Sequence, residues 1–285
     1  MSEGTEAVVS TGWLAQRLGR ADLAILDASW AFPQEKRDLE QEFRARHIPG
    51  AVRFDIDKVS DHASDLPHML PGQAAFADAA GALGIGNDTM VVAYDTAGLM
   101  SAARPWWMFR IFGHDKVAVL DGGLPKWLAE GRPVATGPAA PQKRNFVARF
   151  RPQLVRDADA VLANVASGGE QLVDARSAGR FAGSEPEPRA GLRGGHVPGS
   201  FNVPFVDLLD PATKTLRAPA EIARRFRDSG LDLARPIVAS CGSGITACVL
   251  ALGLHLVGRQ DAAVYDGSWT EWAQRAELPV ETGKR

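Results

Sequence analysis

One cysteine stands where a nucleophile could work. Cys241 follows the apolar run Pro236–Ser240 and opens the segment Cys241-Gly-Ser-Gly-Ile-Thr246, and an apolar stretch then continues to Leu256. This order predicts a strand, a tight glycine loop and a helix. The two glycines allow the backbone N–H groups to turn inward, and a helix start adds partial positive charge. Such a loop favours a nucleophilic thiolate and stabilises an anion attached to it.

Two other roles for the cysteines can be weighed by position. A free cysteine is often a small buried hydrophobic residue, and this is our prediction for Cys248, which lies within the apolar stretch. Cysteine phosphatases are the chemical alternative for Cys241, and they need an arginine after five intervening residues to clamp phosphate. Ala247 stands at that position, so phosphate-ester cleavage is the weaker hypothesis.

The elements around Cys241 belong to an internal repeat. Four blocks of the first half return in the second half in the same order, with offsets of 147, 149, 146 and 145 residues. The pairs are Ile25-Leu-Asp-Ala28 with Leu172-Val-Asp-Ala175, His47-Ile-Pro-Gly-Ala51 with His196-Val-Pro-Gly-Ser200, Val92-Ala-Tyr-Asp95 with Val238-Ala-Ser-Cys241, and Val119-Leu-Asp-Gly-Gly123 with Val264-Tyr-Asp-Gly-Ser268. The chain therefore consists of two copies of one domain.

Each copy alternates short apolar runs with helical patterns, which predicts an α/β fold with a parallel sheet flanked by helices. We place the first domain at 8–137, a linker that begins rich in Pro and Ala at 138–164, and the second domain at 165–281. Asp95 occupies the position of Cys241 in the first copy. That copy therefore has no thiol at this position.

Composition limits the partners. Of the 285 residues, 45% are hydrophobic and 23% charged, and the net charge is −2, so no basic field is available for nucleic acid or a membrane surface. Two cysteines seven residues apart offer neither a disulfide framework nor zinc-ligand spacing. We expect no metal or organic cofactor, a reducing compartment, and the cytoplasm as its location.

These motifs resemble the rhodanese superfamily, and within it the 3-mercaptopyruvate sulfurtransferases. The resemblance extends from Leu26-Asp-Ala-Ser-Trp30 to Tyr265-Asp-Gly-Ser-Trp269, and its most specific part is the Cys241–Thr246 loop. Thiosulfate sulfurtransferases of this family carry basic residues after the cysteine, whereas Gly242 and Ser243 are neutral. The resemblance implies two rhodanese-like domains, of which only the second is catalytic.

The resemblance also implies the residues of the site. Arg180 and Arg189 would bind the carboxylate and carbonyl oxygen of the donor, which suits a small keto acid that needs a cationic fork. Asp57 and His68 would form a pair that reaches Ser243 and moves the donor's thiol proton. The persulfide would be stabilised by the loop, namely Gly242, Ser243, Gly244, Ile245, Thr246 and Ala247.

The implied reaction has two steps. Cys241 takes sulfur from 3-mercaptopyruvate and releases pyruvate, and a second thiol such as thioredoxin or glutathione, or else cyanide, then removes the sulfur. Two alternatives remain besides the phosphatase. The same cysteine could serve a thiosulfate:cyanide sulfurtransferase, or the chain could be a non-catalytic rhodanese-type module that only binds other proteins.

Overall fold

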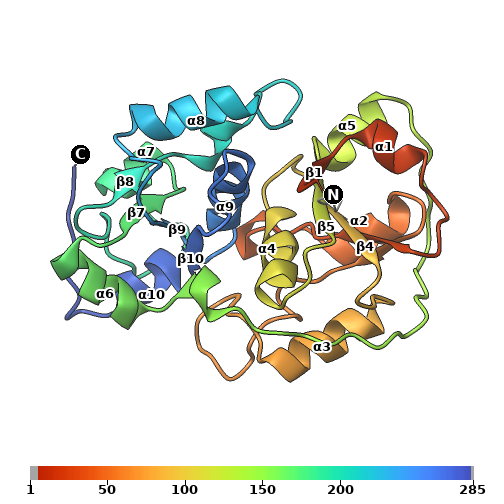
Figure 1. Ribbon diagram of the computed structural model, residues 1–285, viewed down its shortest axis with the longest axis horizontal. Coiled ribbons are helices and arrows are strands. Elements are labelled where there is room, and N and C mark those ends of the chain that lie inside the picture. Colours follow the sequence, from red (N-terminus) through yellow and green to blue (C-terminus); the bar gives the residue numbers. More distant parts are fainter. Residues whose placement is uncertain (1–5, 284–285) are drawn as a thin grey trace. The chain divides into compact units, whose positions relative to one another are not determined.

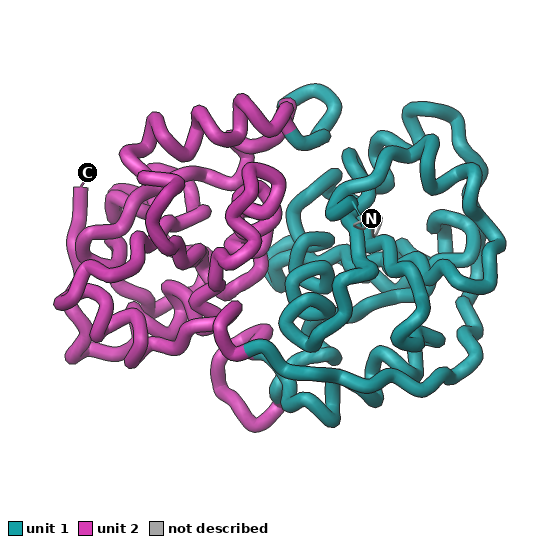
Figure 2. The backbone as a smooth tube through the Cα atoms, in the orientation of Figure 1, with its two compact units in different colours: residues 1–61, 70–151, 211–216 teal, residues 62–69, 152–210, 217–285 magenta. Residues whose placement is uncertain are grey.

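The computed structural model describes residues 6–283. The chain forms two compact units, and each contains one parallel five-stranded sheet. The first unit comprises residues 6–61, 70–151 and 211–216, and the second comprises 62–69, 152–210 and 217–283. Figure 2 shows that the short segments 62–69 and 211–216 carry the colour of the unit formed mainly by the other half of the chain.

The sheet of the first unit has the strand order β1-β5-β4-β2-β3. Its elements are β1 (Val8–Val9), α1 (Thr11–Ala15), β2 (Leu23–Asp27), η1 (Pro33–Glu35), α2 (Leu39–Ala45), β3 (Ala51–Arg53), α3 (Gln73–Ala82), β4 (Met90–Tyr94), α4 (Ala103–Ile111), β5 (Val117–Leu120) and α5 (Gly123–Ala129). Ser10 caps α1 by accepting a hydrogen bond from the Trp13 N–H, as its position before the apolar face of that helix predicts.

The second sheet repeats this order as β6-β10-β9-β7-β8. Its unit contains η2 (Pro152–Leu154), β6 (Val155–Arg156), α6 (Ala158–Ser167), β7 (Gln171–Asp174), α7 (Ala178–Ala182), β8 (Phe201–Asn202), η3 (Phe205–Leu208), α8 (Pro219–Asp228), β9 (Ile237–Ser240), α9 (Ala247–Leu256), β10 (Ala263–Tyr265) and α10 (Ser268–Gln274). Helices cover both faces of the sheet, with α8 beside α9 and α6 beside α10 (Figure 1). The predicted α/β fold is confirmed.

The repeat extends to side-chain packing. Trp127 and Trp272 are both fully buried, and each donates its indole N–H to a proline carbonyl. His47 and His196 each bond a backbone carbonyl through Nδ1 and stack on a phenylalanine, with ring centroids 4.1 and 3.7 Å apart. Since the non-catalytic copy contains the same arrangement, both histidines serve the fold.

The segment predicted to be a linker is divided between the two compact units. Residues up to Arg151 belong to the first unit, and β6 and α6 belong to the second. Arg144 joins the linker to α3, where its N–H donates to the Gly81 carbonyl at 2.9 Å. A Cβ on Gly81 would approach the Arg144 carbonyl oxygen to 2.5 Å. Glycine at this position therefore allows the linker to lie on α3.

Replacing Gly81 with alanine should weaken this packing. Because the clash is with backbone rather than a flexible side chain, we expect Gly81→Ala to lower the free energy of unfolding by about 1–3 kcal/mol. Gly72→Ala, just before the same helix, is the control because a Cβ there meets nothing within 4 Å. Urea unfolding measures both, and equal stability of the two variants would show that the linker does not depend on Gly81.

Candidate active site

Cys241 lies at the carboxyl end of β9, between the strand and α9, as the sequence predicts. β9 is an inner strand, paired with β7 and β10, so this loop emerges from the middle of the sheet's carboxyl edge, where parallel sheets place their ligands. The cysteine is 2% exposed, yet it is not part of the apolar cluster that fills the core around Trp272. Its thiol is therefore shielded from solvent, and the Ser268 hydroxyl lies 4.0 Å from its sulfur.

The hydroxyl of Ser268 lies near this thiol. Its Oγ lies 4.0 Å from Cys241 Sγ, accepts the Cys241 N–H at 3.1 Å and donates to the Tyr265 carbonyl at 2.7 Å. Ser268 is fully buried with φ of +50°, a left-handed conformation that normally favours glycine. The first copy indeed has Gly123 at this place, with φ of +54°. Only the copy with the cysteine places a strained serine here, which marks a functional constraint.

The start of α10 also holds the cysteine loop. The Trp269 N–H donates to the Cys241 carbonyl, and Thr270 donates both its N–H, at 2.9 Å, and its hydroxyl, at 2.6 Å, to the Gly242 carbonyl. These bonds direct the first two carbonyls of the loop toward α10, away from the loop's centre.

The first copy shows what such a loop can hold. The Asp95 carboxylate stands at the position of Cys241, and its Oδ2 accepts three backbone N–H groups, each at 2.8 Å, while Oδ1 accepts a fourth at 2.9 Å. The donors are Ala97, Met100, Ser101 and Ala102. A buried anion is thus stabilised entirely by backbone amides.

The corresponding amides of the second copy are available to another anion. The repeat aligns Met100 and Ser101 with Thr246 and Ala247. No residue between 6 and 283 accepts a hydrogen bond from the backbone N–H of Thr246 or Ala247. A negative charge carried by Cys241 would satisfy them, as the carboxylate does in the first copy.

Arg180 lies beside this loop because a buried carboxylate holds it there. Its NH2 nitrogen is 2.6 Å from the Glu187 carboxylate and 2.9 Å from where a Cβ on Gly242 would be. Glu187 also binds the fully buried Arg176, which pairs with Asp174. Burial alone would lower the pKa of Arg176, but the two carboxylates outweigh it and raise that pKa. Two cations and two anions balance, which a buried cluster requires.

The structure gives His68 and Arg189 a contact that the sequence did not predict. His68 lies in the segment 62–69 of the second unit, is 5% exposed, and has its Nε2 3.1 Å from Arg189 NH2. A guanidinium group can only donate, so Nε2 must accept and the ring proton must lie on Nδ1. Ser243 is 6% exposed in the loop of the same unit, and Asp57 belongs to the first unit. A relay of these three residues stays a prediction.

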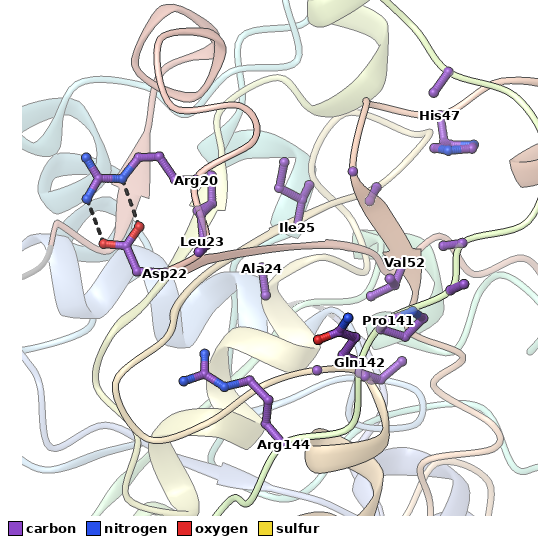
Figure 3. Close-up of a pocket in the computed structure, with 18 of the residues that line it drawn as sticks. Arg20, Asp22, Leu23, Ala24, Ile25, His47, Val52, Pro141, Gln142 and Arg144 are labelled. Carbon is purple, nitrogen blue, oxygen red and sulfur yellow. Dashed lines mark hydrogen bonds and ion pairs between the residues drawn. The ribbon is translucent and has the colours of Figure 1, made fainter.

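The first unit contains a groove of about 930 Å³, lined by residues of β2, β3 and the segment 135–144 (Figure 3). Arg20 and Asp22 pair with each other at its rim, and Arg144 pairs with Asp88. None of the predicted site residues lines this groove.

Comparison with known proteins agrees with this architecture. The family model for the rhodanese-like domain matches residues 10–130 and again 157–275. This chain belongs to the rhodanese family. The human 3-mercaptopyruvate sulfurtransferase is 48% identical to it over 276 residues, covering 95% of this chain and 93% of the relative. The rat thiosulfate sulfurtransferase is 46% identical over 287 residues, covering 98% and 96%.

A solved structure extends the similarity to three dimensions. The crystal structure of SseA from Escherichia coli, described as showing the rhodanese fold and mechanism of 3-mercaptopyruvate sulfotransferases, superposes with a TM-score of 0.85 at 39% identity, and covers 93% of this chain and 99% of that one. The predicted tandem rhodanese is confirmed. Relatives named for either donor are similarly identical, so overall similarity does not distinguish the donors.

Sequence reasoning missed several residues that shape this rhodanese site. Ser268 could have been found, because the repeat aligns it with a glycine and the difference accompanies the change from Asp95 to Cys241. Glu187, between the two predicted arginines, carried no comparable signal.

Residues 6–283 contain no helix long and apolar enough to cross a membrane. The same residues contain no group of three or more His, Cys, Asp or Glu side chains suited to a metal ion.

Two substitutions of Ser268 separate its strain from its hydroxyl. Both Ser268→Gly and Ser268→Ala remove the group beside Cys241, so both should slow sulfur transfer. Only glycine relieves the left-handed backbone, so Ser268→Gly should be about 1 kcal/mol more stable than Ser268→Ala. Denaturant unfolding and turnover with one donor measure the two effects. Full activity in either variant would remove the hydroxyl from the reaction.

Proposed function

We propose that this chain is a sulfurtransferase that takes sulfur from 3-mercaptopyruvate onto Cys241 as a persulfide and passes it to a thiol or to cyanide. The observation that carries the proposal is the correspondence between the Asp95 loop of the first copy and the Cys241 loop of the second. One copy holds the Asp95 carboxylate on backbone amides, and the other places a cysteine at the same point with amides to spare. A persulfide is an anion that such a loop stabilises.

The first step transfers one sulfur atom. The Cys241 thiolate attacks the sulfur of 3-mercaptopyruvate, a sulfur–sulfur bond forms, and the carbon–sulfur bond breaks. Its electron pair leaves with the three-carbon fragment as the enolate of pyruvate. The proton of the donor thiol moves to that enolate, which gives pyruvate and leaves the negative charge on the outer sulfur. Charge and atoms balance, and no redox partner is needed.

Arginines bind and orient the donor in this proposal. Arg180, held by Glu187 beside Gly242, and Arg189 would bind the carboxylate and the keto oxygen. The position of Arg180 also supports a link between the small, neutral residue after Cys241 and a keto-acid donor. A side chain at position 242 would meet the Arg180 guanidinium at 2.9 Å, so an arginine-bound donor and a bulky residue after the cysteine compete for space.

Proton movement is assigned to Ser243, His68 and Asp57. In the free protein His68 Nε2 accepts from Arg189. If Arg189 turns to the donor carboxylate, that lone pair becomes available to a proton. Binding of the donor would thus prepare the base that the reaction uses.

The second step returns the enzyme to its thiolate. A sulfur nucleophile such as reduced thioredoxin or glutathione, or cyanide, attacks the outer sulfur and Cys241 is the leaving group. Because both steps use a free thiolate, a reducing compartment such as the cytoplasm suits the enzyme.

The persulfide itself can be observed directly. After exposure to 3-mercaptopyruvate, mass spectrometry of the intact protein should show one added sulfur atom, mapped to Cys241. Cys241→Ser should neither gain this mass nor transfer sulfur from any donor, since a hydroxyl does not form the bond. Protein that binds partners but never gains sulfur would indicate the non-catalytic module instead.

Donor identity is tested by comparing kcat/KM for 3-mercaptopyruvate and thiosulfate with cyanide as acceptor. We expect the keto acid to be preferred, and Arg180→Ala to reduce its kcat/KM by about 10–100-fold through loss of a charge-assisted contact worth roughly 1.5–3 kcal/mol. Thermal unfolding controls for damage to the Glu187 cluster. A clear preference for thiosulfate would replace the donor assignment.

A further inference from the structure

The second cysteine touches the persulfide loop. Cys248 is fully buried in the first turn of α9, and its Sγ donates to the Gly244 carbonyl oxygen at 3.2 Å. Its backbone N–H goes instead to the Ile245 carbonyl at 3.1 Å. Residue 248 therefore reaches the Gly244 carbonyl through its thiol, and Gly244 has a φ of +78°.

This contact determines where the next amide points. In a trans peptide unit the C=O and N–H groups point in opposite directions. Holding the Gly244 carbonyl toward Cys248 turns the Ile245 N–H the other way. No acceptor for that N–H is present among residues 6–283. The amide is therefore free to meet a ligand of the loop.

The first copy holds the equivalent peptide differently. Ala102 replaces Cys248, and the Gly98 carbonyl oxygen lies 2.7 Å from where a Cβ on Gly123 would be. In the second copy that Cβ exists on Ser268, so Gly244 cannot adopt the same orientation. The φ angles differ accordingly, +109° at Gly98 and +78° at Gly244.

The donors to Asp95 agree with this difference. Its carboxylate accepts from residues 97, 100, 101 and 102, and Leu99, the counterpart of Ile245, is not among them in the described part of the chain. The peptide of the first copy does not supply its amide to the anion. Serine at 268 and cysteine at 248 together accompany the other orientation.

We propose that Cys248 is a positioning residue for the sulfur-transfer reaction: its thiol holds the Gly244–Ile245 peptide so that the Ile245 N–H faces the sulfur carried by Cys241. The Ile245 amide thereby takes the part that Ala102 N–H plays for Asp95, since the corresponding Cys248 N–H donates to the Ile245 carbonyl. This inference rests on the proposed function. In this role Cys248 orients the loop and does not itself react.

Three variants test the role. Cys248→Ala should fit, because alanine occupies the same place in the first copy. Without the thiol, the purified Cys241 persulfide should pass its outer sulfur to a fixed low concentration of glutathione roughly fivefold faster, with the Cys241 thiolate as leaving group, which is the effect of one hydrogen bond. Cys248→Ser keeps a donor and should restore most of the lifetime. Leu250→Ala, fully buried in the same helix, is the control and should lower thermal stability while leaving the lifetime unchanged.

The lifetime is measured by incubating the purified persulfide with this glutathione for set times without donor. Cyanide is then added, and the sulfur that it removes gives the amount of persulfide that remained. Equal lifetimes in the parent protein and Cys248→Ala would overturn the role of Cys248 while leaving the proposed function intact. A serine variant as short-lived as the alanine variant would also overturn it, since the hydrogen bond would not be the cause. A parent protein that forms no persulfide would overturn the proposed function as well.

Discussion

The site depends on backbone amides that converge on one atom. In the first domain that atom is an oxygen of Asp95, and the three N–H groups on it are visible at 2.8 Å. In the second domain the same curve of chain surrounds Cys241. Amides fixed by secondary structure do not reorganise when charge appears, which is why they stabilise an anion well inside a shielded site. The two loops differ at the central residue, Asp95 or Cys241, and at two residues that contact it or its loop, Gly123 or Ser268 and Ala102 or Cys248.

Other residues of the second unit fix the conformation of the Cys241 loop. The start of α10 binds the outward carbonyls of the loop, and Ser268 accepts the strain of a left-handed backbone to place a hydroxyl near the thiol. Around it, the pair of Arg176 and Glu187 fixes Arg180 beside the loop. The bond to the first loop carbonyl also occurs in the first copy, from Leu124 N–H to the Asp95 carbonyl, whereas the strained serine lies only in the copy that carries the cysteine.

Duplication explains why both copies persist with different tasks. The five strands and the buried tryptophans of the two domains correspond one to one. So do His47 and His196, which form isolated β-bridges with Ala135 and Glu281. Either domain could therefore have held the reactive group. Segments 62–69 and 211–216, which occupy similar places in the two copies, each belong to the compact unit of the opposite half. Through the first of these, His68 reaches Arg189, so the catalytic unit contains a residue from the non-catalytic half.

Local sequence determined the features that depend on neighbouring residues. The strand at Ile237–Ser240, the cap at Ser10, the nucleophile and the repeat follow from periodicity, glycine positions and residue order. Tertiary structure decided what depends on residues far apart in the chain. These are the four amides on the Asp95 carboxylate, the Ser268 hydroxyl near the Cys241 sulfur, the Glu187 bridge and the Arg189 contact of His68. Hydrogen bonds are short and directional, so partners from distant segments become known only when folding has placed them within about 3 Å.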